Sequence, residues 1–402
     1  MFEYLGKDTS WKVCSLGDFL SIKNDAWINI DDDTDYRILG VTAKGGGLAV
    51  KRTVTGLELK MREYQVARLN QLMWCKVDTT NGAFGITKPE HIGALSSPNM
   101  ALADIDTEIC LSEFLLLFFK LPAVYDGLTS ASLGTTNRQY LKPQELLRQV
   151  RFHLPSLTEQ RRILTRIEAL AVRVTAAQSL RREASEEAAK FFISALNQVF
   201  TKLEKEHSSR EIQQVCEVVR GGSPRPAGDI RFYGGDIPFV KVGDITKDDN
   251  KFLYSAENTV NELGKQQSRF IKSGTFMLTN SGATLGVPKI TKIDVCFNDG
   301  SQAFLNLSSD IFIEYLYYFF RSKTHWLREV SARGQGQPNL NTDMVKIMKF
   351  PVPPLPEQRR LVAYLDGLQA QVTSLRAAQA ESERELAALM PSVLDRAFKG
   401  EL

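Results

Sequence analysis

The chain has 402 residues, of which 43% are hydrophobic, a composition ordinary for a globular chain of two to three domains. Its net charge of +3 is a weak indication of a polyanionic partner and excludes a protein that binds nucleic acid by bulk charge alone. The longest apolar run, residues 114–119, is far shorter than the ~20 residues of a membrane span, and the N-terminal segment lacks the apolar core of a secretory signal. The five cysteines are scattered without metal-ligand spacing, so we expect a reduced, cytoplasmic protein with buried thiols.

Two segments of the chain return after about half its length. Residues 155–162 (PSLTEQRR) recur as 353–360 (PPLPEQRR), and residues 113–120 (EFLLLFFK) recur as 314–321 (EYLYYFFR). A period of this length indicates two copies of one unit, not a solenoid of short repeats. Because the copies have diverged, we expect the ligand to have two unequal halves.

The first part of each copy has the pattern of short strands and irregular loops. Runs with strand propensity, such as residues 38–41 and 237–242, lie between glycine-rich turns. The repeated Phe/Tyr/Leu run after Glu113 and Glu314 predicts a buried amphipathic helix. Residues 1–153 and 206–350 are therefore predicted to be two globular domains of mixed class, α+β.

A long helix is predicted after each domain, over residues 154–205 and 351–402. Apolar residues recur there at the 3.5-residue spacing of a coiled coil for about five heptads, a length of ~54 Å. The first seam runs through Ile163, Ile167, Leu170, Val174, Ala177, Ala184, Ala188, Phe191 and Ala195. The second runs through Leu361, Leu365, Leu368, Val372, Leu375, Leu386, Leu389 and Val393.

Both seams are interrupted near their midpoints by a polar residue, Arg181 in the first and Gln379 in the second. Midpoints meet in an antiparallel pair, so these residues would fix the register of an antiparallel coiled coil at some loss of stability. The alternative is that each helix packs separately on its own globular half. We favour the pair, which gives a pseudo-two-fold tandem duplication with the two helices as a spacer.

No known catalytic motif is present in the sequence. It has no phosphate-binding loop, zinc helix, nucleophile elbow or dinucleotide fingerprint, and its four histidines are dispersed. The acidic run at residues 31–35 lacks the glycine and closing glutamate of a calcium loop, so a solvated turn is expected there and no metal site is predicted. These absences favour a binding protein over an enzyme.

The candidate binding residues are polar side chains in glycine-rich turns. Arginine reads guanine through two hydrogen bonds and asparagine or glutamine reads adenine, while flanking cations contact phosphates. The alternative for any single loop is a solvated turn. In the second copy the candidates are Ser223, Arg225, Lys241, Asp244, Asn280, Ser281, Arg333, Gln335, Gln337 and Asn339. In the first copy they are Lys44, Lys51, Arg52, Asn81, Asn137 and Arg138.

The chain resembles the DNA-specificity subunit of type I restriction-modification systems over essentially its whole length. The resemblance rests on the two Pro-x-Leu-x-Glu-Gln-Arg-Arg helix starts, on residues 221–224 (GGSP) followed by 237–245 (IPFVKVGDI), and on residues 397–402 (AFKGEL). The first domain is more divergent, because it lacks the GGSP loop and the KVGD element.

The resemblance implies a chain without catalytic activity that reads bipartite double-stranded DNA with one recognition domain for each half-site. It also implies that the helices dock two methyltransferase subunits, which use S-adenosylmethionine, and that a further subunit uses ATP and Mg²⁺ to translocate and cut DNA. The candidate docking residues are Glu159, Gln160, Arg161, Arg162, Glu357, Gln358, Arg359 and Arg360. The alternatives are a fused nuclease–methyltransferase system, a methylation-only system, and a coiled-coil scaffold that binds no DNA.

Overall fold

The computed structural model describes residues 2–4, 10–23, 25–43, 46–76, 82–97, 99–131, 142–282, 284–331 and 340–402. By its internal contacts the chain divides into two compact units. Unit 1 is Met1–Arg181 with Ala380–Leu402, and unit 2 is Arg182–Gln379. The division falls inside two long helices, α4 (Leu157–Glu206) and α10 (Leu355–Phe398), directly after Arg181 and Gln379. Each unit therefore contains a globular body and part of both helices. Among the described helices, none combines the length and hydropathy that a membrane-spanning segment requires.

Unit 1 contains three sheets. The first has the order β3 (Leu20–Ser21), β11 (Met100–Ile105), β8 (Gln71–Cys75), β9 (Phe84–Ile86). The second has the order β4 (Trp27–Asn29), β7 (Glu63–Val66), β10 (Leu95–Ser96), β5 (Asp35–Thr42), β6 (Gly47–Thr55). The third consists of β1 (Phe2–Tyr4), β12 (Val150–Leu154) and β2 (Lys12–Ser15). Its short helices are η1 (Leu16–Asp18), η2 (Gly56–Glu58), η4 (Pro89–His91), α1 (Ser112–Phe118), α2 (Pro122–Ala131) and α3 (Pro143–Gln149).

Unit 2 also contains three sheets. The first has the order β14 (Glu217–Arg220), β22 (Ser301–Leu305), β19 (Phe276–Thr279), β20 (Pro288–Thr291), β16 (Phe252–Leu253). The second has the order β17 (Asn258–Val260), β15 (Tyr233–Val240), β21 (Val295–Phe297), β18 (Arg269–Ile271), and the third pairs β13 (Ser209–Glu211) with β23 (Lys349–Pro351). Its helices are α5 (Ile212–Val215), α6 (Val242–Thr246), α7 (Glu262–Gln267), α8 (Ile313–Ser331) and α9 (Thr342–Lys346).

The two units share one strand topology. In the first sheet β3, β11, β8 and β9 correspond to β14, β22, β19 and β20, and every pair of neighbours is antiparallel in both units. In the second sheet β6, β5, β10 and β7 correspond to β17, β15, β21 and β18, with the same antiparallel, parallel, antiparallel sequence of pairings. The correspondence also keeps the order of the strands along the chain, so the sequence repeat is a repeat of the fold.

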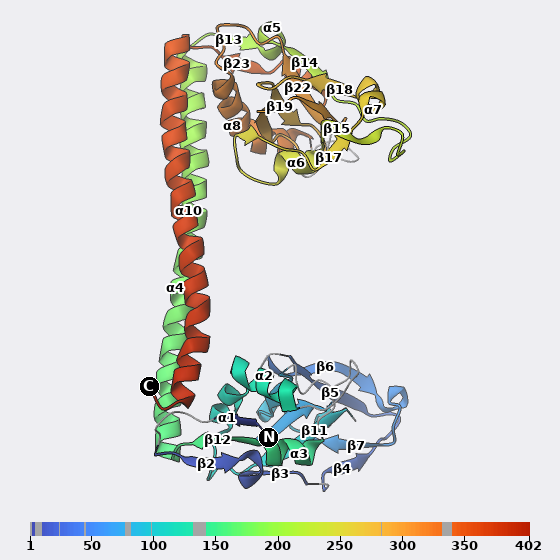
Figure 1. The fold of residues 1–402 in the computed structure, drawn as a ribbon, viewed down its shortest axis with the longest axis vertical. Helices are drawn as coiled ribbons and strands as arrows, with labels where there is room; N and C mark the ends of the chain where they lie inside the picture. Colours follow the sequence, from blue (N-terminus) through green and yellow to red (C-terminus); the bar gives the residue numbers. More distant parts are fainter. Residues whose placement is uncertain are drawn as a thin grey trace. The chain divides into compact units, whose positions relative to one another are not determined.

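The repeated aromatic run forms the centre of each core, as the sequence predicts. In unit 1 the rings of Phe118 and Phe152 stack at 4.2 Å, and in unit 2 Phe319 packs against Phe350 at 5.0 Å. These side chains are fully buried, and full burial of one such side chain contributes about 1.5–3 kcal/mol. The second sheet of each unit lies on the side away from the long helices (Figure 1). The helices thus complete the core of the first sheet only.

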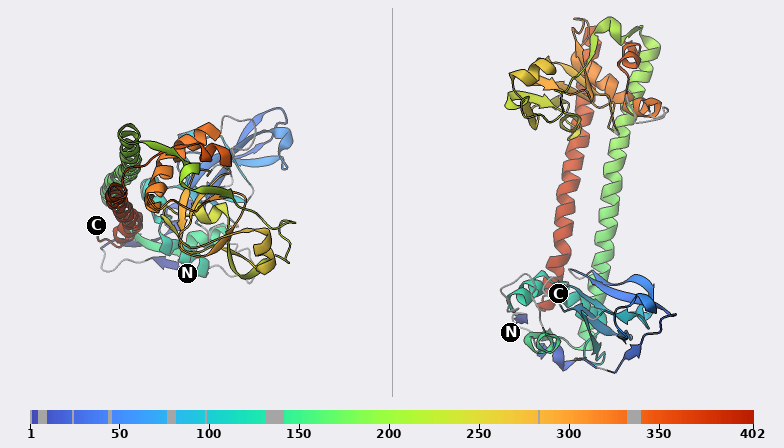
Figure 2. Two further views of the ribbon diagram at one scale, coloured as in Figure 1. Left: turned by 90° about the horizontal axis from the view of Figure 1, so that it is seen from above. Right: turned by 90° about the vertical axis from the view of Figure 1, so that its right-hand side faces the viewer.

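The two long helices pair within each unit. In unit 1 the start of α4, through Ile163 and Ile167, shares a core with the end of α10, through Leu394 and Phe398. In unit 2 the second half of α4 shares a core with the first half of α10, and α4 and α10 lie side by side in both Figure 1 and Figure 2. One helix therefore advances as the other returns, which confirms the predicted antiparallel pair. With 50 and 44 residues, both helices are longer than the predicted seams.

The seam departs from the prediction in its second half. Phe191, predicted to be a seam residue, is 61% exposed, whereas Phe192 is buried. Phe192 packs edge-on against Tyr318 of α8, so the aromatic core of unit 2 determines which face of α4 turns inward. Between Val174 and Phe192, and between Val372 and Leu394, every residue is described and none is buried. The middle of each helix therefore lacks the apolar core of an ordinary coiled coil.

Arg181 contacts the other helix in this middle region. Its guanidinium Nη1 donates a hydrogen bond to the carbonyl oxygen of Ser382 at 3.1 Å, and both residues belong to unit 1. This hydrogen bond joins the two helices within unit 1, and the role of Arg181 in fixing the register stays a prediction. The corresponding role of Gln379 stays a prediction.

Candidate nucleic-acid interface

A groove lined by several of the predicted binding residues lies in the globular body of unit 2. It has a volume of about 700 Å³ and is formed by the loop after β14, the strands β15 and β17, and the turn after β21. Three of the predicted binding residues, Ser223, Arg225 and Lys241, line it. The structure thus brings together residues that are up to 18 positions apart in the sequence and places them on one surface.

The loop after β14 is held against the body by close packing and hydrogen bonds. A Cβ atom on Gly221 would lie 2.1 Å from the carbonyl oxygen of Asn298, so only glycine fits this approach. Ser268 donates its hydroxyl hydrogen to the Gly222 carbonyl at 2.8 Å, and the Arg225 amide donates to Gln267 Oε1 at 2.9 Å. The loop is therefore fixed at its base, and the Arg225 side chain, 71% exposed, extends from it.

Asp299 also lines the groove and is absent from the predicted residues. Ser223 Oγ donates to Asp299 Oδ1 at 2.8 Å, and Arg225 Nη2 lies 3.7 Å from Asp299 Oδ2. The backbone carbonyl of Asp299 accepts hydrogen bonds from Arg220 Nε at 2.8 Å and from Asn280 Nδ2 at 3.2 Å. The Asn298-Asp299-Gly300 turn after a buried strand is the sequence feature that could have indicated this position.

Lys241 and Asp244 have different surroundings. Lys241 Nζ donates to Asn258 Oδ1 at 2.9 Å on the groove wall, so its cation remains on the surface. Asp244 is only 3% exposed and accepts hydrogen bonds from the backbone amides of Lys241 at 2.8 Å and Glu257 at 2.9 Å. The prediction of Asp244 as a DNA contact is wrong, because its carboxylate caps α6 and holds the adjacent loop.

Asn280 is likewise fully buried and its amide donates within the body, so it supports the groove and does not reach a ligand directly. Ser281, the next residue, is partly exposed. Among the described residues, the buried oxygens Asn280 Oδ1, Asn298 Oδ1, Ser301 Oγ and Gln302 Oε1 have no hydrogen-bond partner. Leu340 is tied to the same place, since its amide donates to the Asn280 carbonyl at 2.7 Å and its carbonyl accepts from Gln302 Nε2 at 2.9 Å.

Several predicted residues fall outside the described part of the chain. They are Arg333, Gln335, Gln337 and Asn339 in the second copy, and Lys44, Asn81, Asn137 and Arg138 in the first. In unit 1 the predicted residues Lys51 and Arg52 are exposed on β6, where Lys51 lies across Gly40 of β5. Both remain available to a ligand from this strand.

The two predicted docking segments begin the long helices. Gln160 and Gln358 are fully buried and hydrogen-bonded within their own units, so these two side chains cannot contact a partner, and their assignment to a docking surface is corrected. Glu159 binds Arg162 at 2.6 Å, and this hydrogen-bonded guanidinium lowers the pKa of the Glu159 carboxyl.

The other members of these segments lie nearer the surface. Arg161 and Arg360 are exposed, Glu357 lies 3.5 Å from His207, and the Arg359 guanidinium lies 4.6 Å from the centre of the Phe312 ring. The docking role of these residues and of Glu159 and Arg162 stays a prediction.

All five cysteines are buried, and burial raises the pKa of the Cys216 thiol to about 12. A thiol that is protonated at neutral pH is a poor nucleophile and a poor metal ligand. Within the described ranges no cluster of three or more His, Cys, Asp or Glu residues could hold a metal ion. The groove of unit 2 is built from hydrogen-bonding groups and charges of both signs.

The fold consists of two units of one topology and an antiparallel helical pair. Comparison with known proteins shows which proteins the chain resembles. Residues 204–383 match the family model described as the type I restriction modification DNA specificity domain. Over this segment the chain is similar to type I specificity subunits, in agreement with the resemblance seen in its sequence.

Curated relatives include the type I restriction enzyme MjaIX specificity subunit of Methanocaldococcus jannaschii, 28% identical over 174 residues. A putative type I restriction enzyme specificity subunit, S.HindORF215P of Haemophilus influenzae, is 28% identical over 150 residues. The alignments cover 42% and 35% of this chain but only 39% and 35% of the two relatives. The matched part is therefore well under two thirds of either relative.

Solved structures match the fold over nearly the whole chain. A chain from a structure on complex assembly and conformational transition of the type I R-M system aligns with a TM-score of 0.76 and 22% identity, covering 98% of this chain and 99% of that chain. The HsdS subunit from Thermoanaerobacter tengcongensis aligns with a TM-score of 0.66 and 23% identity, covering 98% and 97%. At these identities the agreement concerns the fold.

Proposed function

We propose that this chain is the DNA-specificity subunit of a type I restriction-modification complex. In this role unit 1 and unit 2 each read one half of a bipartite double-stranded DNA target, and the chain itself catalyses no reaction. The observation that carries the proposal is the repeated topology of two units, one of which presents Arg225, Lys241 and Asp299 in a single groove. Two equivalent readers on one chain suit two half-sites, because the strands of a duplex are themselves related by two-fold symmetry.

The chemistry of the groove supports base reading more than phosphate binding. Arginine donates to guanine, an aspartate accepts from the amino group of cytosine, and serine does either. A groove that pairs Arg225 with Asp299 gains little from charge alone, in keeping with the modest net charge of +3. We therefore expect partner subunits to supply much of the phosphate contact.

The long helices carry the proposed docking surface for methyltransferase subunits. Val172, Leu180 and Phe191 of α4 are 69%, 66% and 61% exposed, and large apolar side chains at this exposure favour a protein partner. The use of S-adenosylmethionine, ATP and Mg²⁺ by such partners, a nuclease among them, and a cytoplasmic location are further parts of the proposal.

The test is a gel-shift titration of this chain co-expressed with its methyltransferase partner, followed by single-molecule methylome sequencing of the host. We expect a sequence-specific shift and one bipartite motif with a fixed gap. A complex that assembles but binds all duplexes equally would contradict the proposal and favour a scaffold. A purified chain that transfers methyl groups without a partner would contradict the absence of catalysis.

A further inference from the structure

Unit 1 contains a pocket that occupies the place of the unit 2 groove. It has a volume of about 190 Å³, and its lining includes Ile22, Trp27, Gln65, Lys76 and Ser97. None of these residues is among the candidates predicted from the sequence. The exposed Lys51 and Arg52 do not line it.

The shared topology places pocket and groove at equivalent positions. Ile22 and Trp27 follow β3, just as Ser223 and Arg225 follow β14. Ser97 follows β10, just as Asp299 follows the corresponding strand β21. In both units, then, the loop after the first strand of the first sheet meets the turn after the parallel strand of the second sheet.

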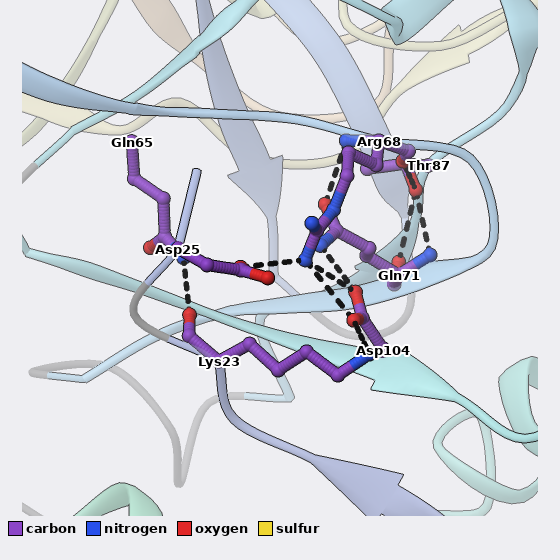
Figure 3. A network of polar contacts seen from close by, with 7 residues as sticks. All are labelled: Lys23, Asp25, Gln65, Arg68, Gln71, Thr87 and Asp104. Carbon is purple, nitrogen blue, oxygen red and sulfur yellow. Dashed lines mark hydrogen bonds and ion pairs between the residues drawn. The ribbon is translucent and has the colours of Figure 1, made fainter. Parts of the chain in front are cut away.

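The loop after the first strand is fastened in the same way in both units. In unit 1, Gln65 of β7 donates from Nε2 to the carbonyl of Lys23 at 3.3 Å (Figure 3). In unit 2, Ser268, directly before the corresponding strand β18, donates to the carbonyl of Gly222 at 2.8 Å. Lys23 and Gly222 are each the second residue after the strand. This shared contact supports the same equivalence.

A charged network fixes the loop further in unit 1. Arg68 Nη2 lies 3.1 Å from Asp25 and 3.0 Å from Asp104, and Lys23 Nζ lies 3.1 Å from Asp104 (Figure 3). Gln71 donates to Asp104 at 2.6 Å. The loop that leads to Trp27, the first residue of β4, is thus held by hydrogen bonds and ion pairs, although the indole itself is 46% exposed. A rigid support under an exposed aromatic side chain is the arrangement that a recognition site requires.

We propose that this pocket is the DNA-reading site of unit 1 and that Trp27 contacts base edges of the first half-site. The inference rests on the proposed function and specifies where the divergent unit reads. Trp27 supplies an apolar surface for a thymine methyl group or a base edge, and the serine at the turn supplies a hydrogen-bonding group. The unit 1 pocket is more apolar than the unit 2 groove, which contains Arg225 and Asp299. The two units should therefore prefer different bases, so the two half-sites differ in sequence.

The test uses the full chain in complex with its methyltransferase partner and compares Trp27→Ala with Leu57→Ala. Leu57 is also in unit 1, is 74% exposed and does not line the pocket. Binding is titrated with duplexes in which each position of both half-sites is varied singly. We expect Trp27→Ala to lose about tenfold discrimination at one or more positions of one half-site only, with Leu57→Ala as wild type.

Each other outcome overturns the inference. If Trp27→Ala kept wild-type discrimination at both half-sites, the reading site of unit 1 would lie elsewhere. A double variant Lys51→Ala, Arg52→Ala that changed discrimination at one half-site would then locate the site on β6. If Trp27→Ala lost discrimination equally at both half-sites and had a lowered melting temperature, Trp27 would support the fold and would not read DNA. In that case Trp27→Phe would not restore discrimination at one half-site selectively. A wild-type complex without sequence-specific binding would overturn the proposed function as well, so the two failures are distinguishable.

Discussion

Gln160 and Gln358 make the same three hydrogen bonds in the two units. Gln160 accepts from the Leu111 amide at 2.8 Å and donates to the carbonyls of Ile109 and Pro155. Gln358 accepts from the Phe312 amide at 2.8 Å and donates to the carbonyls of Asp310 and Pro353. Each glutamine joins the start of a long helix to the loop before the repeated aromatic helix, so the repeated Glu-Gln-Arg-Arg motif fixes a helix on its body.

We expect Gln160→Ala and Gln358→Ala to destabilise the chain by about 1–3 kcal/mol each, because buried backbone groups lose their partners. Urea denaturation of each variant measures this change. The exposed Arg161→Ala serves as the control and should stay within about 0.5 kcal/mol of wild type. A stable Gln160→Ala that failed to bind the methyltransferase would restore the docking role that burial excludes.

Gly221→Ala should displace the loop after β14, since the added methyl group would lie 2.1 Å from a backbone oxygen that cannot yield easily. We expect a loss of about 1–3 kcal/mol in stability and weaker recognition of one half-site. Gly243→Ala is the matched control, because a Cβ there meets nothing within 4 Å. Thermal unfolding measures the change in stability, and methylome sequencing measures the change in recognition. If Gly221→Ala matched Gly243→Ala in both measurements, the close approach of Gly221 to the Asn298 carbonyl oxygen would be refuted.

Asp299→Asn keeps the size of the side chain but removes its charge beside Arg225. We expect stronger binding to unrelated DNA, because repulsion from phosphates is relieved, and altered base preference in one half-site. Titrations at several salt concentrations with specific and unrelated duplexes separate the two effects. Asp236→Asn, exposed on β15 away from the groove lining, is the control. Equal behaviour of both variants would contradict a role for Asp299 in reading.

Tyr4 of β1 donates its hydroxyl hydrogen to Asp395 of α10 at 2.5 Å, and Lys399 pairs with the same carboxylate at 2.7 Å. Although burial acts in the opposite direction, these contacts lower the pKa of Asp395. A lowered folded-state pKa gives stability that is present above the ordinary carboxyl pKa of about 3.9 and is lost as the pH falls through the folded value. Asp395→Asn should therefore flatten the acid side of the pH–stability curve. An unchanged pH–stability curve would show that the Asp395 contacts do not contribute to the stability of unit 1.

Removing residues 183–189 together with 375–381 shortens each long helix by one heptad in a region without buried side chains. If the helices act as a spacer between readers, the tolerated gap between half-sites should change or assembly should fail. Methylome sequencing measures the gap. An unchanged gap in an assembled complex would refute the spacer.

The sequence predicted the elements whose pattern is local and repeated. The aromatic helices followed from spacing, because periodicity reports which face is buried, and the antiparallel pair followed from the polar break near the midpoint of both seams. The choice between Phe191 and Phe192 did not follow, since it depends on Tyr318, more than a hundred residues away. Asp299 and Trp27 were missed for the same reason: tertiary contacts, not neighbours in sequence, bring them to a pocket. The repeat of Gln160 and Gln358 was seen correctly, but sequence cannot distinguish a repeated internal bond from a repeated docking surface.

Unit 1 is assembled from both ends of the chain, because β1 and the last turns of α10 meet at Tyr4 and Asp395. Unit 1 cannot finish folding until unit 2 has been synthesised and the end of α10 is available. Unit 2, in contrast, is one continuous segment and can fold as soon as residue 379 is available. Translation therefore imposes an order on the two units, and a chain that lacks the last turns of α10 loses support in unit 1, most of which is synthesised first.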